Sequence, residues 1–260
     1  MMELVVTDTR EAVVRHLRTT LGTLQIPASH GVTVRVEDGC VSRWDAPGVC
    51  YVNGGNTVGV MAGRLDTKLL ELVPGCEPDV AQTIKTQGIR ARDGTHHLPL
   101  FSALLSRSPQ NSKWLLNSPC MYLPGHHSAR GTRNAFHATH TALSMVVTAN
   151  RAGMNIRRVV MAGMCTGHGR MNRLEAARQM MDAVRAVFVD KRLVEDGTQA
   201  QHPRLLCNPQ YSVQDKCVDH EPFQPMVAYI LADGSCEVRE PEVVKTFRSG
   251  GSEEPSPFEK

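Results

Sequence analysis

The chain has 260 residues, 41 % of them hydrophobic, which is enough for one globular domain with a sizeable core. Its 29 basic and 26 acidic residues leave a formal net charge of +3, and no basic run is interleaved with aromatic residues, so composition carries no strong nucleic-acid signal. The N-terminus lacks the apolar segment of a signal peptide, and no stretch is long enough to span a membrane. We therefore expect a cytoplasmic or nuclear protein.

Strands and helices are predicted to alternate over residues 1–75. Apolar runs and an alternation of valine with polar residues indicate three strands, at 4–6, 32–36 and 49–52. Asp8, with Glu11 three residues later, is typical of a helix start in which Asp8 is the capping residue. A short helix over 65–72 ends before Pro74-Gly75.

The alternation continues from residue 76 to residue 190. The region 78–111 is weakly patterned and predicts a helix at 80–85 followed by a polar stretch rich in loops. A central strand at 114–116 comes next, then a helix with Phe136, Leu143 and Val147 on one face that ends near Gly153, and then a strand at 156–161. Asn172 with Glu175 predicts the start of the next helix, whose buried side is formed by Leu174, Ala177, Met181 and Val184.

We expect this pattern to fold as a three-layer α/β/α structure with a mixed, mostly parallel central sheet. Residues 1–190 form the predicted domain, and 191–248 a C-terminal extension packed on it, with a β-hairpin about Asp233-Gly234. The polar segment 249–260 is predicted to be a disordered tail. In such sheets, ligands bind beyond the carboxyl ends of the strands.

The most informative segment is the glycine-rich loop from Gly163 to Gly169, which lies between a predicted strand and a predicted helix. Glycine allows backbone N–H groups to approach a ligand, and a helix start favours anions, so the loop predicts a phosphate site. It is neither a Walker A motif, because it is too short and lacks the lysine, nor a G-x-G-x-x-G fingerprint, because Asn172 takes the last glycine's place. The alternative is an ordinary connection with glycines for tight packing.

A second loop of interest follows the strand at 49–52. Asn53-Gly54-Gly55-Asn56 alone is consistent with a turn. It continues to Gly63-Arg64-Leu65-Asp66 at the start of a helix, where Asp66 either interacts with the helix dipole or orients and deprotonates water. Both glycine-containing loops follow strands, so we expect them to face one ligand.

These two segments resemble those of macrodomains, the ADP-ribose-binding modules. Val52 to Asn56, continued by Gly63 to Asp66, is similar to the family's V-N-x-x-N…G-G-x-D segment, and 162–169 is similar to its diphosphate-wrapping loop. The closest similarity is to the divergent macro-like branch, the Appr-1″-p processing type. Three patterns of that branch, G-N-S-x-G-x-M-D-G-G-x-D, A-P-T-M-x-x-P and A-A-x-Q-M, are similar to residues 55–66, 118–124 and 176–180 of this chain. The resemblance covers about residues 4–189.

The resemblance implies binding of ADP-ribose or a derivative, and hydrolysis of ADP-ribose 1″-phosphate or of protein-linked ADP-ribose in enzymatic members. Asn56 would position the distal ribose and Asp66 would activate water. The implied ligand-binding residues are Asn53, Gly55, Gly63, Gly163, Met164, Cys165, Thr166, Gly167, His168 and Gly169. The acid that reads adenine is Asp8 or Asp38. We expect neither a cofactor nor a metal ion.

Three departures from the family pattern bear on activity: Ala62 replaces an aspartate, Arg64 a glycine and Cys165 a glycine. Ala62 removes a possible catalytic carboxylate, so a non-catalytic reader of ADP-ribosylated partners is the alternative function.

Two further alternatives come from other chemistry. A cysteine followed by an arginine, Cys165 and Arg170, is similar to a thiolate phosphatase loop with one residue too few between them, and a buried inert thiol is the alternative. A zinc site is possible by residue type, although the spacing matches no compact finger, at His202, Cys207, Cys217 and His220.

Overall fold

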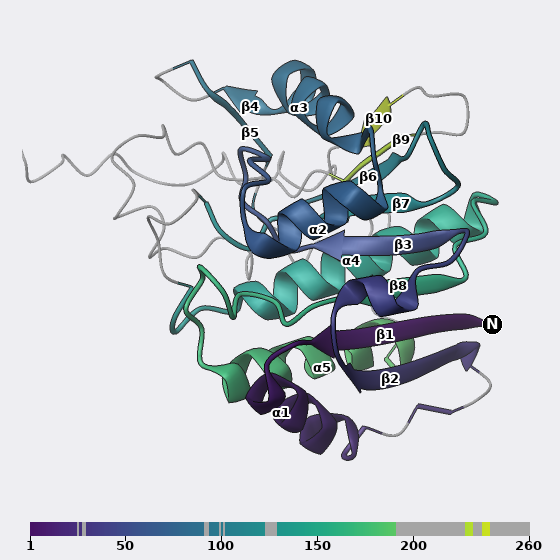
Figure 1. The fold of residues 1–260 in the computed structure, drawn as a ribbon, viewed down its shortest axis with the longest axis vertical. Helices are drawn as coiled ribbons and strands as arrows, with labels where there is room; N and C mark the ends of the chain where they lie inside the picture. Colours follow the sequence, from purple (N-terminus) through teal and green to yellow (C-terminus); the bar gives the residue numbers. More distant parts are fainter. Residues whose placement is uncertain are drawn as a thin grey trace, which may run out of the picture.

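The computed structural model describes residues 1–24, 26–27, 30–90, 94–98, 100, 102–122, 129–190, 227–230 and 236–239. Eight strands form one sheet in the order β10-β9-β6-β7-β3-β8-β1-β2 (Figure 1). The strands of this sheet are β1 (Met2–Asp8), β2 (Val32–Asp38), β3 (Val49–Asn53), β6 (Ala103–Arg107), β7 (Trp114–Asn117), β8 (Arg158–Met161), β9 (Val227–Ile230) and β10 (Cys236–Arg239). A separate antiparallel pair is formed by β4 (Ile89–Arg90) and β5 (His96–His97).

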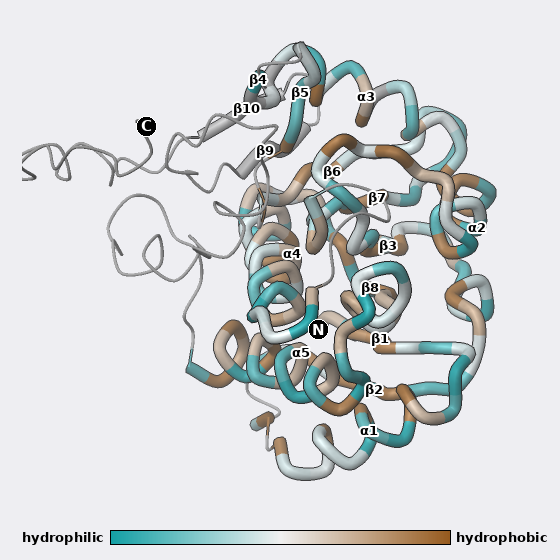
Figure 2. The backbone as a smooth tube through the Cα atoms, turned by 90° about the vertical axis from the view of Figure 1, so that its left-hand side faces the viewer, coloured by the Kyte–Doolittle hydropathy of each residue, from teal (hydrophilic) through white to brown (hydrophobic). Residues whose placement is uncertain are grey.

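Helices cover both faces of the large sheet. One face packs against α1 (Glu11–Leu21), α4 (Asn134–Arg151) and α5 (Arg173–Phe188). The other packs against α2 (Arg64–Leu72), α3 (Cys76–Gln87) and the 3-10 helix η2 (Val41–Trp44). In Figure 2, α4 and α5 lie on one side of the strands and α2 on the other.

Two apolar cores, one on each face, explain why the central strands are apolar along their whole length. Successive side chains of a strand point to opposite faces. On β1, Leu4 and Val6 therefore enter the core beneath α1 and α5, whereas Val5 enters the core beneath α2. The β8 strand repeats the pattern, with Val159 and Met161 on the first side and Val160 on the second. The predicted three-layer α/β/α fold is confirmed.

The sheet is mixed and mostly parallel, as expected. β1 pairs in parallel with β2 and β8, β3 with β7 and β8, and β6 with β9, whereas β6–β7 and β9–β10 are antiparallel. The registers place Met161 opposite both Val6 and Val52, and Asn53 opposite Asn117. The carboxyl ends of β1, β8, β3 and β7 therefore meet at one edge, from which the two glycine-containing loops start.

Two predictions about local structure are wrong. The stretch expected to be loop-rich contains the strand β6, which is buried from Ala103 to Ser106 and ends at Arg107. Its alanine and two leucines favour helix over strand, so its composition does not reveal the strand.

The second concerns the start of α1. Asp8 does not cap α1, because it is the last residue of β1. The N-cap is Arg10, whose side chain accepts no capping hydrogen bond, while Asp8 Oδ1 accepts from the Arg10 backbone N–H at 3.0 Å.

Much of the C-terminal region lies outside the described residues, including the tail 249–260 and the possible zinc ligands His202, Cys207, Cys217 and His220. Its two described strands, β9 and β10, pair antiparallel, and β9 extends the sheet beside β6. The division at residues 190 and 248 stays a prediction. No helix among the described residues is long and apolar enough to cross a membrane.

Candidate functional site

The loop after β3 is held along the segment that follows β7. Asn53 Nδ2 donates to Asn117 Oδ1 at 3.0 Å, joining the carboxyl ends of the two strands. The Cys120 N–H donates to the Gly55 carbonyl at 3.1 Å, and the Thr57 N–H donates to the Tyr122 carbonyl at 3.1 Å. These bonds fix the position of the loop relative to the sheet edge.

Asn56 shapes this loop with its own amide. Its Oδ1 accepts from the Val60 N–H at 3.1 Å, and its Nδ2 donates to the Val60 carbonyl at 2.8 Å. A primary amide has two N–H groups, so one N–H of Asn56 is left by this pair. The side chain is buried. Sequence reasoning missed this local role.

Asp66 lies in the first turn of α2, as expected. Its Oδ2 accepts from the Gly63 N–H at 2.8 Å, which ties the start of the helix to the loop before it. The negative carboxylate is also favourable near the positive end of the helix dipole. The structural role is thus established by geometry, and Oδ1 makes no hydrogen bond with the described residues.

The loop after β8 leaves a run of backbone donors unused. The Met164 N–H points to Met180 Sδ at 3.3 Å, the Arg170 N–H donates to the Gly167 carbonyl, and the Met171 N–H donates to the Cys165 carbonyl. Between them, the amides of residues 165–168 donate to no group among the described residues. Cys165 has a left-handed backbone, with φ of 58°. Successive unpaired amides around such a residue form an arrangement that binds anions.

The three glycines of this loop have different surroundings. A Cβ on Gly169 would lie 2.7 Å from the Cys165 carbonyl oxygen, and one on Gly163 would lie 2.9 Å from Asp8 Oδ2. Both are therefore required for close packing. A Cβ on Gly167 would have no heavy atom within 4 Å, so this position faces open space. Gly167 is the place where a ligand can approach the backbone.

The two loops meet at two places. A Cβ on Gly54 would lie 2.4 Å from Met164 Sδ, and a Cβ on Gly63 would lie 3.9 Å from His168 Cε1. The expectation that both loops face one site is therefore consistent with their contact. We call residues 53–66 and 163–169 together the two-loop site.

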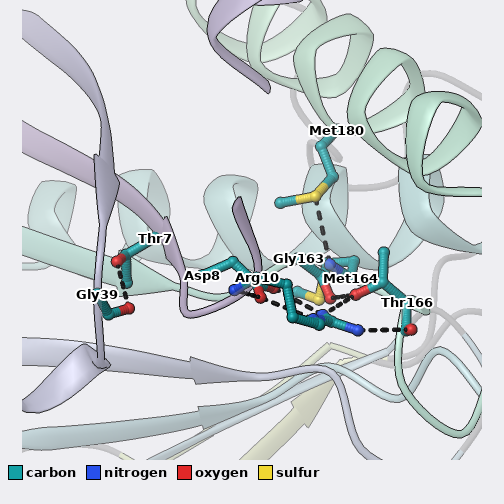
Figure 3. Close-up of polar contacts among 8 residues, drawn as sticks. All are labelled: Thr7, Asp8, Arg10, Gly39, Gly163, Met164, Thr166 and Met180. Carbon is teal, nitrogen blue, oxygen red and sulfur yellow. Dashed lines mark hydrogen bonds and ion pairs between the residues drawn. The ribbon is translucent and has the colours of Figure 1, made fainter. Parts of the chain in front are cut away.

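An ion pair behind the second loop was not predicted. Arg10 Nε donates to Asp8 Oδ1 at 2.8 Å, and Nη2 donates to Asp8 Oδ2 at 2.7 Å; Nη1 also donates to the Thr166 carbonyl at 2.8 Å (Figure 3). The hydrogen bond with Asp8 raises the pKa of Arg10. Asp8, one of the two acids left open above, lies behind the second loop with both carboxylate oxygens bound by Arg10, whereas Asp38 lies exposed at the end of β2. The acid that reads adenine stays a prediction.

Cys165 does not have the properties of a phosphatase nucleophile. Burial raises the pKa of its thiol, and the neighbouring Cys120 thiol raises it further. A thiolate nucleophile needs the opposite shift. Both cysteines are buried, and Cys120 Sγ also donates to the Gly54 carbonyl at 2.9 Å.

The described residues contain no group of three or more histidine, cysteine or acidic side chains that could hold a metal ion. Ala62 and Arg64, the two substitutions in the first loop, are exposed.

The fold and these loops define an α/β protein with a glycine-containing loop of unpaired backbone amides at the carboxyl edge of its sheet. Solved structures similar to the chain include the macrodomain of Mycobacterium tuberculosis DarG (16 % identity, TM-score 0.45, 58 % of this chain and 90 % of that chain). They also include the Trypanosoma brucei macrodomain in complex with ADP (12 % identity, TM-score 0.41, 71 % of this chain and 87 % of that chain). No family model and no curated protein matches the chain.

Proposed function

We propose that this protein binds ADP-ribose or a derivative at the two-loop site, with the diphosphate at residues 163–169. The observation that carries the proposal is the run of four backbone amides, 165–168, that donate to no described group. Preorganised N–H groups at a strand-to-helix loop favour phosphate oxygens. The macrodomain-like motifs at 52–66 and 162–169 narrow the phosphate ligand to ADP-ribose.

The first loop supplies the other wall. Asn53, Gly55 and Gly63 shape its backbone, and the remaining N–H of Asn56 is available to a ribose hydroxyl. His168 lies beside Gly63, so the distal ribose would sit between the two loops. ADP-ribosylated protein is the larger partner that such a site would accept.

Isothermal titration calorimetry with ADP-ribose tests the proposal. Gly167→Leu should fold normally, because Gly167 faces open space and its φ is not in the left-handed region, but its side chain would occupy the ligand's place. We expect this variant to lose binding. Thr33→Leu, on the exposed side of β2, is the matched control and should bind like the wild type. Wild-type protein that does not bind ADP-ribose would contradict the proposal.

Between enzyme and reader, we propose binding without turnover. The amide of Asn56 is engaged by Val60, one oxygen of Asp66 is engaged by Gly63, and Ala62 stands where the macro-like pattern has an aspartate. Asn56 and Asp66, the side chains that would position and activate water, thus already make hydrogen bonds within the loop. A reader needs only the binding surface.

Hydrolysis is the second candidate, and one observation favours it. Asp66 and His168 approach Gly63 from different loops, so a carboxylate and an imidazole adjoin the same point. Such a pair can orient and deprotonate water. Release of phosphate from ADP-ribose 1″-phosphate, or of ADP-ribose from modified protein, by wild type but not by Asp66→Asn would favour the hydrolase. No release by protein that binds ADP-ribose would favour the reader.

A further inference from the structure

The guanidinium of Arg10 joins the end of β1 to the second loop, 156 residues further along the chain. Its Nε and Nη2 take both carboxylate oxygens of Asp8, and its Nη1 and Nη2 donate to the carbonyl and the hydroxyl of Thr166, at 2.8 and 2.5 Å. Figure 3 shows the arginine lying between these two partners. Thr166 Oγ1 in turn donates to the Gly163 carbonyl at 2.8 Å, which closes the loop on itself.

This contact determines the direction of one of the unpaired amides. In a trans peptide unit, the C=O of one residue and the N–H of the next point in opposite directions. Arg10 holds the Thr166 carbonyl toward the end of β1, so the Gly167 N–H points away from it. Gly167 is also the position with open space around it. The arginine therefore directs the central donor of the 165–168 run outward.

Arg10 also neutralises a carboxylate directly behind the loop. The position of a Cβ on Gly163 is 2.9 Å from Asp8 Oδ2, and the Asp8 side chain is only 4 % exposed. A buried carboxylate without a partner is costly, and it would repel a bound phosphate. The bidentate pair with Arg10 removes this repulsion.

Helix stability does not explain an arginine here. Arg10 occupies the N-cap of α1, where it makes no side-chain capping bond, and a positive charge at a helix N-terminus is unfavourable. Its side chain is 37 % exposed, yet its guanidinium is held by both Asp8 and Thr166. Binding both partners at once requires several N–H groups in a fixed fork, which arginine has and lysine lacks.

We propose that Arg10 is a positioning residue for anion binding: it orients the Thr166–Gly167 peptide so that its N–H points to the ligand, and it screens the ligand from Asp8. This rests on the proposed function of the two-loop site. Arg10 acts through the loop and is not assigned a contact with the reacting atoms.

The test compares four variants by calorimetry with ADP-ribose, by thermal unfolding and by hydrogen exchange in ligand-free protein. Arg10→Ala should weaken binding by about tenfold or more, because it removes charged hydrogen bonds. It should also speed exchange of the Arg170 and Met171 amides, whose bonds close the loop. Arg10→Lys should restore little of either. Arg15→Ala, on the exposed side of α1, is the control and should change neither.

The double variant Asp8→Asn/Arg10→Ala separates orientation from charge and avoids an unpaired buried carboxylate that could unfold the single variant. We expect it to bind more tightly than Arg10→Ala but more weakly than wild type, with loop exchange still fast. Wild-type affinity in the double variant would show that Arg10 acts only on the charge of Asp8, and would overturn the orienting role. Wild-type affinity and exchange in Arg10→Ala would overturn the whole inference.

The two proposals fail separately. If wild-type protein does not bind ADP-ribose, the proposed function is wrong, while the exchange of Arg170 and Met171 still reports whether Arg10 holds the loop. If wild-type protein binds ADP-ribose and the Arg10 variants match it in affinity and in amide exchange, the inference about Arg10 is wrong while the proposed function stands. A fall in unfolding temperature without a change in affinity assigns Arg10 a purely structural role and also overturns the inference.

Discussion

Gly54 and Met164 are in direct contact across the two-loop site, because a Cβ on Gly54 would lie only 2.4 Å from the methionine Sδ. The contact joins the loop after β3 to the loop after β8. Met164 is buried, and Cys120 Sγ lies 3.4 Å from the same Cβ position. The separation of the two loops therefore depends on the absence of a side chain at residue 54.

Gly54→Ala should push Met164 out of its place and shift the second loop. We expect a loss of about 1–3 kcal/mol in the free energy of unfolding and weaker ADP-ribose binding, because overpacking a well-packed position forces neighbours to move. Adding Met164→Ala to this variant removes the clash. If the double variant binds no better than Gly54→Ala, the contact does not determine the separation of the loops. Chemical denaturation and calorimetry measure the two effects.

Gly169 and Gly167 should respond differently to the same small substitution. Gly169→Ala places a Cβ 2.7 Å from the Cys165 carbonyl oxygen, and backbone cannot move aside as a flexible side chain can. We expect a lower unfolding temperature and a disturbed loop. Gly167→Ala meets nothing within 4 Å and is the matched control, with an unfolding temperature near that of wild type. Equal unfolding temperatures for the two variants would contradict the assigned packing of the loop.

The elements predicted from sequence are those whose signal is local. The apolar runs of β1, β3 and β8 follow from burial on both faces, and the start of α5 follows from Asn172, whose Oδ1 accepts from the Leu174 and Glu175 N–H groups. The strand β6 was missed because its short run of alanine and leucine has no strand preference of its own. Its pairing with β7 supplies what composition does not.

The site is predictable in outline and not in its contacts. The glycines and their strand-to-helix context predict an anion site at this loop, since both are visible in a few consecutive residues, and anion binding there stays a prediction. Arg10 could not be found this way, because Thr166 is 156 residues distant. The engagement of Asn56 by Val60 depends on the turn between them, which is formed in three dimensions. Only the folded chain brings such partners together.

Cysteine reactivity should separate a structural Cys165 from a nucleophilic one. A hydrogen bond from Ser42 lowers the pKa of the partly exposed Cys40, whereas burial, followed by the Cys120 thiol, raises the pKa of Cys165. The thiolate is the reactive form. Brief treatment of native protein with iodoacetamide should therefore label Cys40 before Cys165, as measured by peptide mapping. Cys165→Ser should keep ADP-ribose binding. Rapid labelling of Cys165 would contradict its structural role and favour the thiolate mechanism.

Glu3 connects three neighbouring strands and should make stability depend on acid. Its Oε2 accepts from Arg158 Nε of β8 at 2.6 Å, and its Oε1 from Arg35 Nη1 of β2 at 3.2 Å. Burial alone would raise the pKa of Glu3, but the hydrogen bonds and charges of Arg158 and then Arg35 outweigh it and lower the pKa below its ordinary 4.5. The unfolded chain therefore binds the proton at higher pH than the folded chain does.

The direction of the pH dependence follows from the lower pKa of Glu3 in the folded chain. The stabilisation by Glu3 is fully present above the unfolded pKa of 4.5 and is lost as the pH falls through the lower folded value. Because the side chain is partly exposed, we expect Glu3→Gln to cost about 0.5–1 kcal/mol near neutral pH. The difference in unfolding temperature from wild type should shrink when the pH is lowered to about 3. A constant difference for Glu3→Gln across this pH range would mean that the bridge between β2, β1 and β8 adds nothing to stability.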